Sequence, residues 1–88
     1  MTDERRRKKL QFRAWRRGFR ELDLLMGSFA DTYLGSYDSD GLDAFERLLD
    51  VPDWEIYGWL VGQEPVPESH RSPVLDQLIA FRYAAQSG

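Results

Sequence analysis

The sequence predicts an all-α fold, a small single-domain bundle of about five helices. Apolar residues recur at helical spacing in several stretches, and no stretch alternates with the period of two that is typical of a β-strand. Glycine or proline separates these stretches from one another. The hydrophobic content of 42% in 88 residues is sufficient for the core of one domain and too high for a disordered chain.

The first predicted helix covers residues 6–17, and residues 1–5 are expected to form a disordered basic N-terminus. The single helical domain is therefore placed at residues 6–85. A narrow apolar stripe runs along the first helix and consists of Leu10, Ala14 and Trp15. Phe12 lies outside this stripe and is expected to be partly exposed. Gly18 is expected to end or sharply kink the helix.

The second helix has the strongest pattern in the chain. Its apolar residues follow the spacing of one helical face, namely Leu22, Leu25, Met26, Phe29, Ala30, Tyr33 and Leu34. Glu21 and Asp23 lie in the first turn, where carboxylates complement the helix dipole. Gly27 is an interior glycine, which costs about 1 kcal/mol relative to alanine, and we expect it to let a neighbouring helix pack closely. Gly35 is the predicted end of this helix.

Capping residues predict where the third and fourth helices begin. Asp38 or Ser39 is expected to cap the third helix. Its apolar residues are Leu42, Phe45, Leu48 and Leu49. Pro52 interrupts the helical pattern, because a proline disfavours helical geometry in the residue before it. Asp53 is expected to cap a short fourth helix that ends at Gly62.

The fourth helix is expected to bury Ile56, Tyr57 and Leu60. Trp59 flanks this stripe, whereas Trp54 lies further round the helix and is expected to be exposed. Residues 63–68 form an extended proline-containing loop. Ser72 followed by Pro73 is typical of a helix start, with the cap directly before a proline at the first helical position. One face of this fifth helix would hold Val74, Leu75, Leu78, Ile79 and Arg82.

The net charge of −3 conceals a strong division along the chain. Residues 1–20 carry a net charge of +7, and residues 21–88 carry −10. Either the basic segment folds against the acidic body, or the resulting dipole orients the protein on a partner. The basic run from Arg5 to Lys9 could also contact the phosphates of a nucleic acid. The sequence pI near 5.0 argues against this alternative of a small nucleic-acid-binding regulator.

Several classes of site have no support in the sequence. There is no cysteine, so a disulfide framework or a thiolate metal site is excluded. The single histidine, His70, is expected to be an exposed and inert loop residue. The aspartates near residue 40 lack the spacing of a calcium loop, and the glycines do not form a phosphate-binding loop. Without an apolar run of about 20 residues or the apolar core of a secretory signal, the chain is expected to be a cytoplasmic bacterial protein that does not enter a membrane.

The junction between the first two helices, Arg16 to Glu21, is the most unusual stretch of the chain. In one interpretation, Arg17 and Glu21 form a local salt bridge across the corner, and Gly18 supplies backbone freedom. In the other, Gly18 lets a partner approach closely, and Arg17 and Glu21 offer that partner a fork of donors and a carboxylate. The residues alone leave both interpretations open.

The segment Arg17-Gly18-Phe19-Arg20-Glu21 resembles the RGxxE motif of the succinate dehydrogenase flavinylation factors, called SdhE in bacteria and known also from mitochondria. Two later blocks resemble the third and fourth helices of that family, Phe45 to Leu49 and Asp53 to Leu60. The resemblance covers roughly residues 8–82. It implies a five-helix fold and an assembly factor rather than an enzyme.

The same resemblance implies a partner and a site. Family members bind the flavoprotein subunit of succinate dehydrogenase, or of the related fumarate reductase, and promote covalent attachment of FAD to a histidine of that subunit. The FAD would belong to the target, with no cofactor held tightly by this chain. The partner-binding residues would be Arg17, Gly18 and Glu21, with Phe19 and Arg20 at the variable positions of the motif and Arg16 beside it. We expect Gly18→Arg or Glu21→Ala to lower flavinylation of the target and leave the fold intact. A protein-interaction module of another kind, centred on Trp54 or Phe12, is a third possibility.

Overall fold

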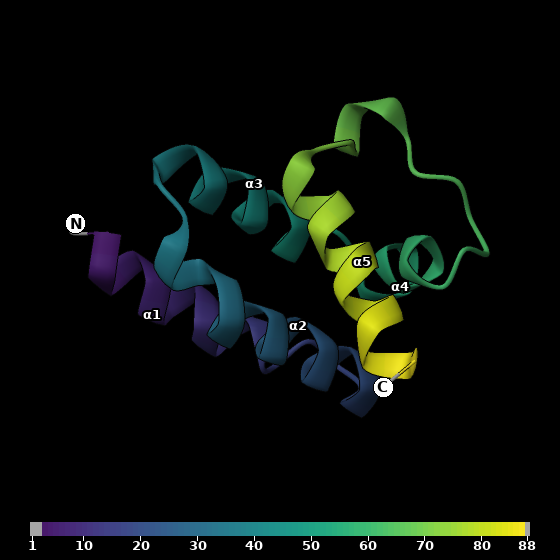
Figure 1. Ribbon diagram of the computed structural model, residues 1–88, viewed down its shortest axis with the longest axis horizontal. Helices are drawn as coiled ribbons and strands as arrows, with labels where there is room; N and C mark the ends of the chain where they lie inside the picture. Colours follow the sequence, from purple (N-terminus) through teal and green to yellow (C-terminus); the bar gives the residue numbers. More distant parts are fainter. Residues whose placement is uncertain (1–2, 88) are drawn as a thin grey trace.

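The computed structural model describes residues 3–87, without the side chains of residue 83 and residues 85–87. This range contains five α-helices and two short 3-10 turns and no strand, which confirms the predicted all-α class (Figure 1). The helices are α1 (Asp3–Ala14), α2 (Arg20–Tyr33), α3 (Ser39–Leu49), α4 (Asp53–Leu60) and α5 (Pro73–Ser87). The turns are η1 (Leu34–Ser36) and η2 (Glu68–His70).

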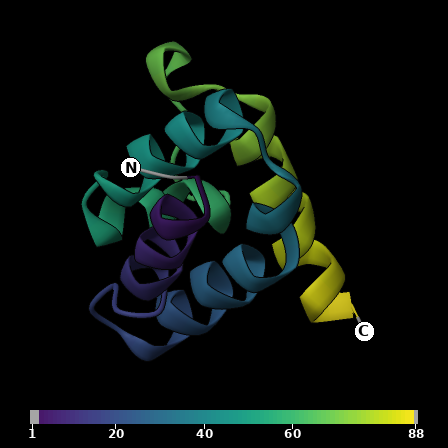
Figure 2. The same cartoon turned by 90° about the vertical axis from the view of Figure 1, so that its left-hand side faces the viewer.

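The helices pack as a bundle with α1 and α2 side by side along one edge. They run in opposite directions, joined by the corner at residues 15–19, and Figures 1 and 2 show them adjacent in both views. Helix α3 packs on α1, and α5 crosses both α2 and α3. The short helix α4 packs on α5. This arrangement brings α4 near the start of α2, although the two helices lie far apart in the sequence.

Two ends of the first helix differ from the prediction. α1 begins at Asp3, so residues 3–5 are helical rather than disordered, and Met1 and Thr2 lie outside the described residues. α1 ends at Ala14, three residues earlier than expected, because the chain leaves the helix in a turn at Trp15 and Arg16. The corner before α2 is therefore a five-residue connection rather than a single break at Gly18.

The predicted caps are confirmed for α3 and α5 and are wrong for α4. The Asp38 carboxylate accepts a hydrogen bond from the Gly41 N–H at 3.0 Å, and the Ser72 hydroxyl accepts one from the Leu75 N–H at 3.1 Å. Pro52 occupies the cap position of α4, so Asp53 is the first helical residue instead. The Asp53 carboxylate is free to turn away from α4 and pairs with an arginine of the corner.

The apolar faces of the predicted helices converge on one core. Phe29 of α2 and Phe45 of α3 lie at its centre with ring centroids 5.8 Å apart, and both are fully buried. Trp59 is buried rather than flanking, while Tyr57 and Ile79 are only half-buried. The other large side chains that are fully buried are Leu10, Leu22, Met26, Leu34, Leu42, Leu48, Ile56, Leu60, Leu75 and Leu78.

Gly27 allows a close approach, as expected, but its neighbour is a side chain and not a second helix. A Cβ atom at this position would overlap the indole ring of Trp15. The ring lies against the backbone of α2 just after α1 ends, and its Nε1 donates to the Asp31 carboxylate at 3.3 Å. Gly27 thus fixes how closely the corner packs onto α2.

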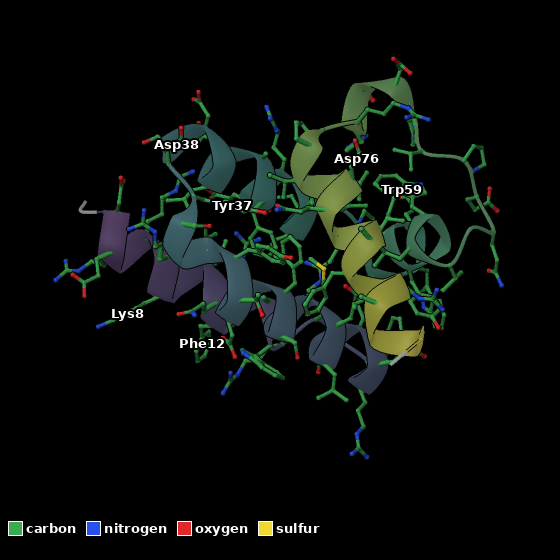
Figure 3. All side chains as sticks on the ribbon, in the orientation of Figure 1. Lys8, Phe12, Tyr37, Asp38, Trp59 and Asp76 are labelled. Atoms are coloured by element: carbon green, nitrogen blue, oxygen red, sulfur yellow. The ribbon has the colours of Figure 1, made fainter. Side chains whose placement is uncertain are left out.

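Part of the basic segment folds against the acidic body. Arg6 pairs with Asp43 and with Glu46, the latter at 2.9 Å, and Arg13 pairs with Asp50 at 2.8 Å. The Arg7 guanidinium donates to the backbone carbonyls of η1 and of the residue after it. These contacts attach α1 to α3 and to η1, although exposed ion pairs such as those of Arg6 and Arg13 each contribute less than about 1 kcal/mol. Lys8 and Phe12 project from the opposite side of α1 (Figure 3).

Candidate functional site

The corner between α1 and α2 owes its shape to Gly18 and Asp23. Gly18 has a φ of +141°, a backbone conformation that residues with a side chain rarely adopt. Asp23, in the first turn of α2, turns its carboxylate back over the corner and accepts hydrogen bonds from the backbone N–H groups of Arg17 and of Gly18, the latter at 3.1 Å. Phe19, the cap residue of α2, provides no side-chain acceptor. The Asp23 carboxylate therefore satisfies donors that would otherwise lie unpaired at this helix start.

Arg17 points inward and joins the corner to the junction between α3 and α4. Its side chain is 8% exposed, and its Nη2 lies 2.9 Å from the Asp53 Oδ1. The two terminal nitrogens also donate to the carbonyl oxygens of Leu49 and Val51. Because Leu49 is the last residue of α3 and Val51 follows it closely, the guanidinium charge also complements the negative end of that helix dipole. Its Nε is buried without a hydrogen-bond partner in the described part of the chain. The contacts of the two terminal nitrogens therefore keep the guanidinium in place.

The salt bridge between Arg17 and Glu21, which one of the two interpretations of the corner required, is not formed. In the described range, Arg17 pairs instead with Asp53 in the first turn of α4. A buried guanidinium that already has these partners is a fixed structural element. Whether Arg17 also contacts a partner protein stays a prediction.

The absence of a side chain at Gly18 is required by the chain itself. A Cβ atom there would overlap the Asp53 carboxylate, which Arg17 holds in place. The positive φ adds strain for any residue with a side chain. Both features predict that Gly18→Arg destabilises the fold, contrary to the expectation from the sequence, and this outcome stays a prediction. The Gly18 backbone is nevertheless exposed, so a partner can still approach it from the side away from Asp53.

The outer side of the corner carries the remaining motif residues. Glu21 is exposed, and its hydrogen bond with the Tyr57 side chain is the main reason that the pKa of Tyr57 is raised, followed by desolvation. The ring of Phe19 stacks on that of Trp54, with centroids 4.8 Å apart and planes inclined by 15°. Arg20 is exposed on the first turn of α2.

Trp54 and Arg16 extend the surface of the corner beyond the five residues of the motif. Trp54 is 74% exposed, as predicted, but it lies beside the corner instead of marking a separate surface. The stripe of α4 placed Trp54 outside the core, yet nothing in the sequence showed that Phe19 would meet it. Arg16 lies over the ring of Phe12, with its guanidinium carbon 3.9 Å from the centroid, and so extends the corner toward the outer face of α1.

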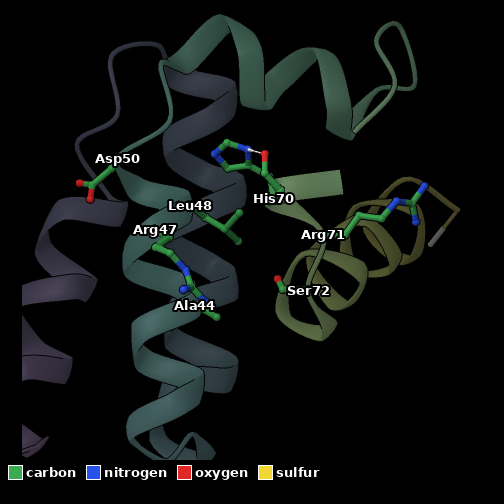
Figure 4. Close-up of a pocket in the computed structure, with 8 residues that line it drawn as sticks. Ala44, Arg47, Leu48, Asp50, His70, Arg71 and Ser72 are labelled. Atoms are coloured by element: carbon green, nitrogen blue, oxygen red, sulfur yellow. Dashed lines mark hydrogen bonds between the residues drawn. The ribbon is translucent and has the colours of Figure 1, made fainter. Parts of the chain in front are cut away.

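A second surface feature is a hollow of about 320 Å³ between α3 and η2 (Figure 4). Arg47, His70 and Ser72 are among the residues that line it. The Ser69 hydroxyl lies 3.2 Å from Nδ1 of His70, but both residues are exposed on a three-residue turn. A catalytic dyad would need a buried base with a third group to orient it. The hollow therefore does not indicate nucleophilic chemistry.

No group of three or more acidic or histidine side chains within residues 3–87 is placed to hold a metal ion. No helix there combines the length and the hydropathy needed to cross a bilayer.

Comparison with known proteins finds a family match over most of the chain. Residues 8–82 match the protein family described as "Flavinator of succinate dehydrogenase". The "FAD assembly factor SdhE" of Acetobacter pasteurianus is 36% identical over 74 residues, which cover 84% of this chain and 68% of that protein. The "Succinate dehydrogenase assembly factor 2, mitochondrial" of Scheffersomyces stipitis is 45% identical over 81 residues, which cover 88% of this chain and 54% of that protein.

A vertebrate protein shows the same relationship. The "Succinate dehydrogenase assembly factor 2, mitochondrial" of Danio rerio is 35% identical over 78 residues, or 86% of this chain and 49% of that protein. The chain thus spans about half the length of the two mitochondrial relatives. The matched region, residues 8–82, contains the whole corner together with α2, α3 and α4.

Proposed function

Because this chain belongs to the family of succinate dehydrogenase flavinators, we propose that it is an assembly factor, and not an enzyme, that promotes covalent attachment of FAD to the flavoprotein subunit of succinate dehydrogenase. The family match over residues 8–82 is the observation that carries this proposal. The flavoprotein of fumarate reductase is proposed as a second target. The site of action would be the bacterial cytoplasm.

The residues of the motif are proposed to have different roles at the corner. Glu21, Arg20 and the exposed Gly18 backbone are proposed to contact the target. Arg17 is proposed to act through position, because its buried guanidinium fixes the backbone that presents those groups. Phe19 and Arg16 flank the contact surface on either side.

The proposed mechanism requires no reacting group on this chain. The FAD and the histidine that receives it both belong to the target, and the flavin supplies the bond-forming chemistry. The assembly factor would stabilise the arrangement of the target in which these two groups meet. Correct orientation of two reacting groups can lower a barrier by several kcal/mol.

The nucleic-acid alternative receives no support from the family match or from the relatives. Three of the arginines that it would need are engaged within the chain, namely Arg6, Arg7 and Arg13.

The proposal is tested in cells that lack this protein and are complemented with the wild-type chain. Denatured extracts are separated on a gel, and flavin fluorescence is read at the size of the succinate dehydrogenase flavoprotein. We expect fluorescence to disappear in the deletion strain and to return on complementation, while immunoblotting shows equal amounts of the flavoprotein. Full fluorescence in the deletion strain would contradict the proposal.

A further inference from the structure

Three aromatic side chains form a continuous surface beside the corner, which we call the aromatic platform: Phe19, Trp54 and Tyr57. Phe19 and Trp54 are stacked, and Tyr57 meets Phe19 edge-on at 5.2 Å and Trp54 edge-on at 6.3 Å. Phe19 comes from the corner, whereas the other two come from the first two turns of α4. The platform therefore spans two segments that are distant in the sequence.

The exposure of Trp54 is not explained by the stability of the fold. The core contact of α4 is made by Ile56, Trp59 and Leu60, which are all buried. Trp54 remains 74% exposed despite its stack on Phe19. Burial of apolar surface is favourable, so a partner that covers this ring gains binding free energy. Tryptophan is also among the residues that most often dominate protein–protein interfaces.

The platform is connected to the charged part of the corner. The side chains of Tyr57 and Glu21 lie beside each other, so the aromatic rings and this exposed carboxylate form one surface. An occupant of this surface must offer an apolar recess for the indole and, beside it, a cation for Glu21. These requirements describe a folded protein surface with an arginine or lysine at the edge of an apolar hollow.

We propose that the aromatic platform is the apolar half of the surface that docks on the target flavoprotein, with Trp54 as its principal contact. This inference rests on the proposed function, because it takes the flavoprotein as the occupant. Trp54 inserts into an apolar recess of that subunit, and Glu21 pairs with a cation next to it. Phe19 supports the indole from behind and keeps it oriented for insertion.

The test measures the affinity of purified chain variants for the FAD-loaded flavoprotein subunit by calorimetry. Trp54→Ala is expected to weaken binding about tenfold or more. Phe12→Ala is the matched control, since Phe12 is an exposed aromatic residue (59%) on α1 outside the platform, and its affinity should stay within about twofold of wild type. Trp54→Phe keeps a ring on Phe19 and should bind with intermediate affinity. Circular dichroism checks that each variant is folded.

Radical footprinting of the wild-type chain provides a second measurement that does not depend on how any variant folds. Oxidation of Trp54 should fall when the flavoprotein is added, while oxidation of Phe12 should not change. Equal affinities of wild type and Trp54→Ala, or unchanged oxidation of Trp54 in the complex, would overturn the platform and leave the proposed function standing. If wild type itself does not bind the flavoprotein, the proposed function fails.

Discussion

Arg17 and Asp53 form an ion pair of 2.9 Å that ties the corner between the first two helices to the first turn of α4. The pair is largely buried, with the two side chains 8% and 27% exposed. The ion pair also excludes a side chain at position 18, because the Asp53 carboxylate occupies the space where that side chain would begin. Arg17 and Gly18 of the motif are thus linked through the carboxylate of Asp53, which lies outside the motif.

Replacing Arg17 by alanine is expected to destabilise the fold. The change removes the ion pair and leaves the carbonyls of Leu49 and Val51 without their donor. The free energy of unfolding should fall by about 2–4 kcal/mol, as for other buried charged groups that lose a partner. Urea denaturation measures this difference. Arg20→Ala is the control, because Arg20 is exposed, and its effect should stay below about 0.5 kcal/mol.

Arg17→Lys should show an intermediate loss of stability, because an ammonium group cannot reach two carbonyls and a carboxylate in the geometry of the guanidinium fork. An Arg17→Ala variant as stable as wild type but unable to bind the flavoprotein would instead show that Arg17 contacts the target directly.

Gly18→Ala is expected to be more harmful than Gly62→Ala. Both glycines have positive φ, at +141° and +78°, so both substitutions introduce backbone strain of about 1–2 kcal/mol. A side chain at Gly18 also overlaps Asp53, whereas the space around Gly62 is open within 4 Å. Thermal unfolding of the two variants should therefore place Gly18→Ala several degrees below Gly62→Ala. Equal midpoints would mean that Asp53 moves aside at little cost.

Glu21→Ala should separate function from folding. Glu21 is exposed, and its removal takes away only a surface contact with Tyr57. We expect a change in stability below about 0.5 kcal/mol together with a loss of flavin fluorescence on the target in complemented cells. Asp76→Ala removes the same charge from an exposed position on α5 and should complement fully. Normal flavinylation with Glu21→Ala would remove Glu21 from the site.

Tyr37 makes the stability of the fold depend on pH at the alkaline end. Burial, and secondarily the neighbouring Tyr33, raises the pKa of Tyr37 to about 12. The Tyr37 hydroxyl donates to the Gln77 side chain in α5. Since the folded-state pKa lies above the unfolded value of about 10, the stabilisation is complete below about pH 10 and is lost as the pH rises through about 12.

Urea denaturation at about pH 9 and about pH 11 tests this dependence. Between the two, wild type should lose more stability than Tyr37→Phe, by at most about 1 kcal/mol because the side chain is partly exposed. The Tyr37→Phe variant serves as the control for all other groups that titrate in this range. An identical loss in both proteins would show that Tyr37 does not contribute.

Local interactions account for the parts of the fold that were predictable. The apolar periodicity of α2 and α3, the caps Asp38 and Ser72, and the exposed position of Trp54 all depend on residues within a few positions of each other. The predicted cap at Asp53 was wrong for the opposite reason. The partner of Asp53 is Arg17, which lies far away in the sequence. This ion pair between distant residues outweighs a local capping bond.

Helical periodicity and capping are short-range properties of the chain, so the helical class and the approximate extent of the helices could be predicted from the residues, as could the position of the motif. The direction of the Arg17 side chain and the ring that covers Phe19 could not be predicted in this way. Those outcomes depend on where α3 and α4 pack, and that packing follows from burial of the whole core. The inward Arg17, the space denied at Gly18 and the platform beside Glu21 are consequences of that packing.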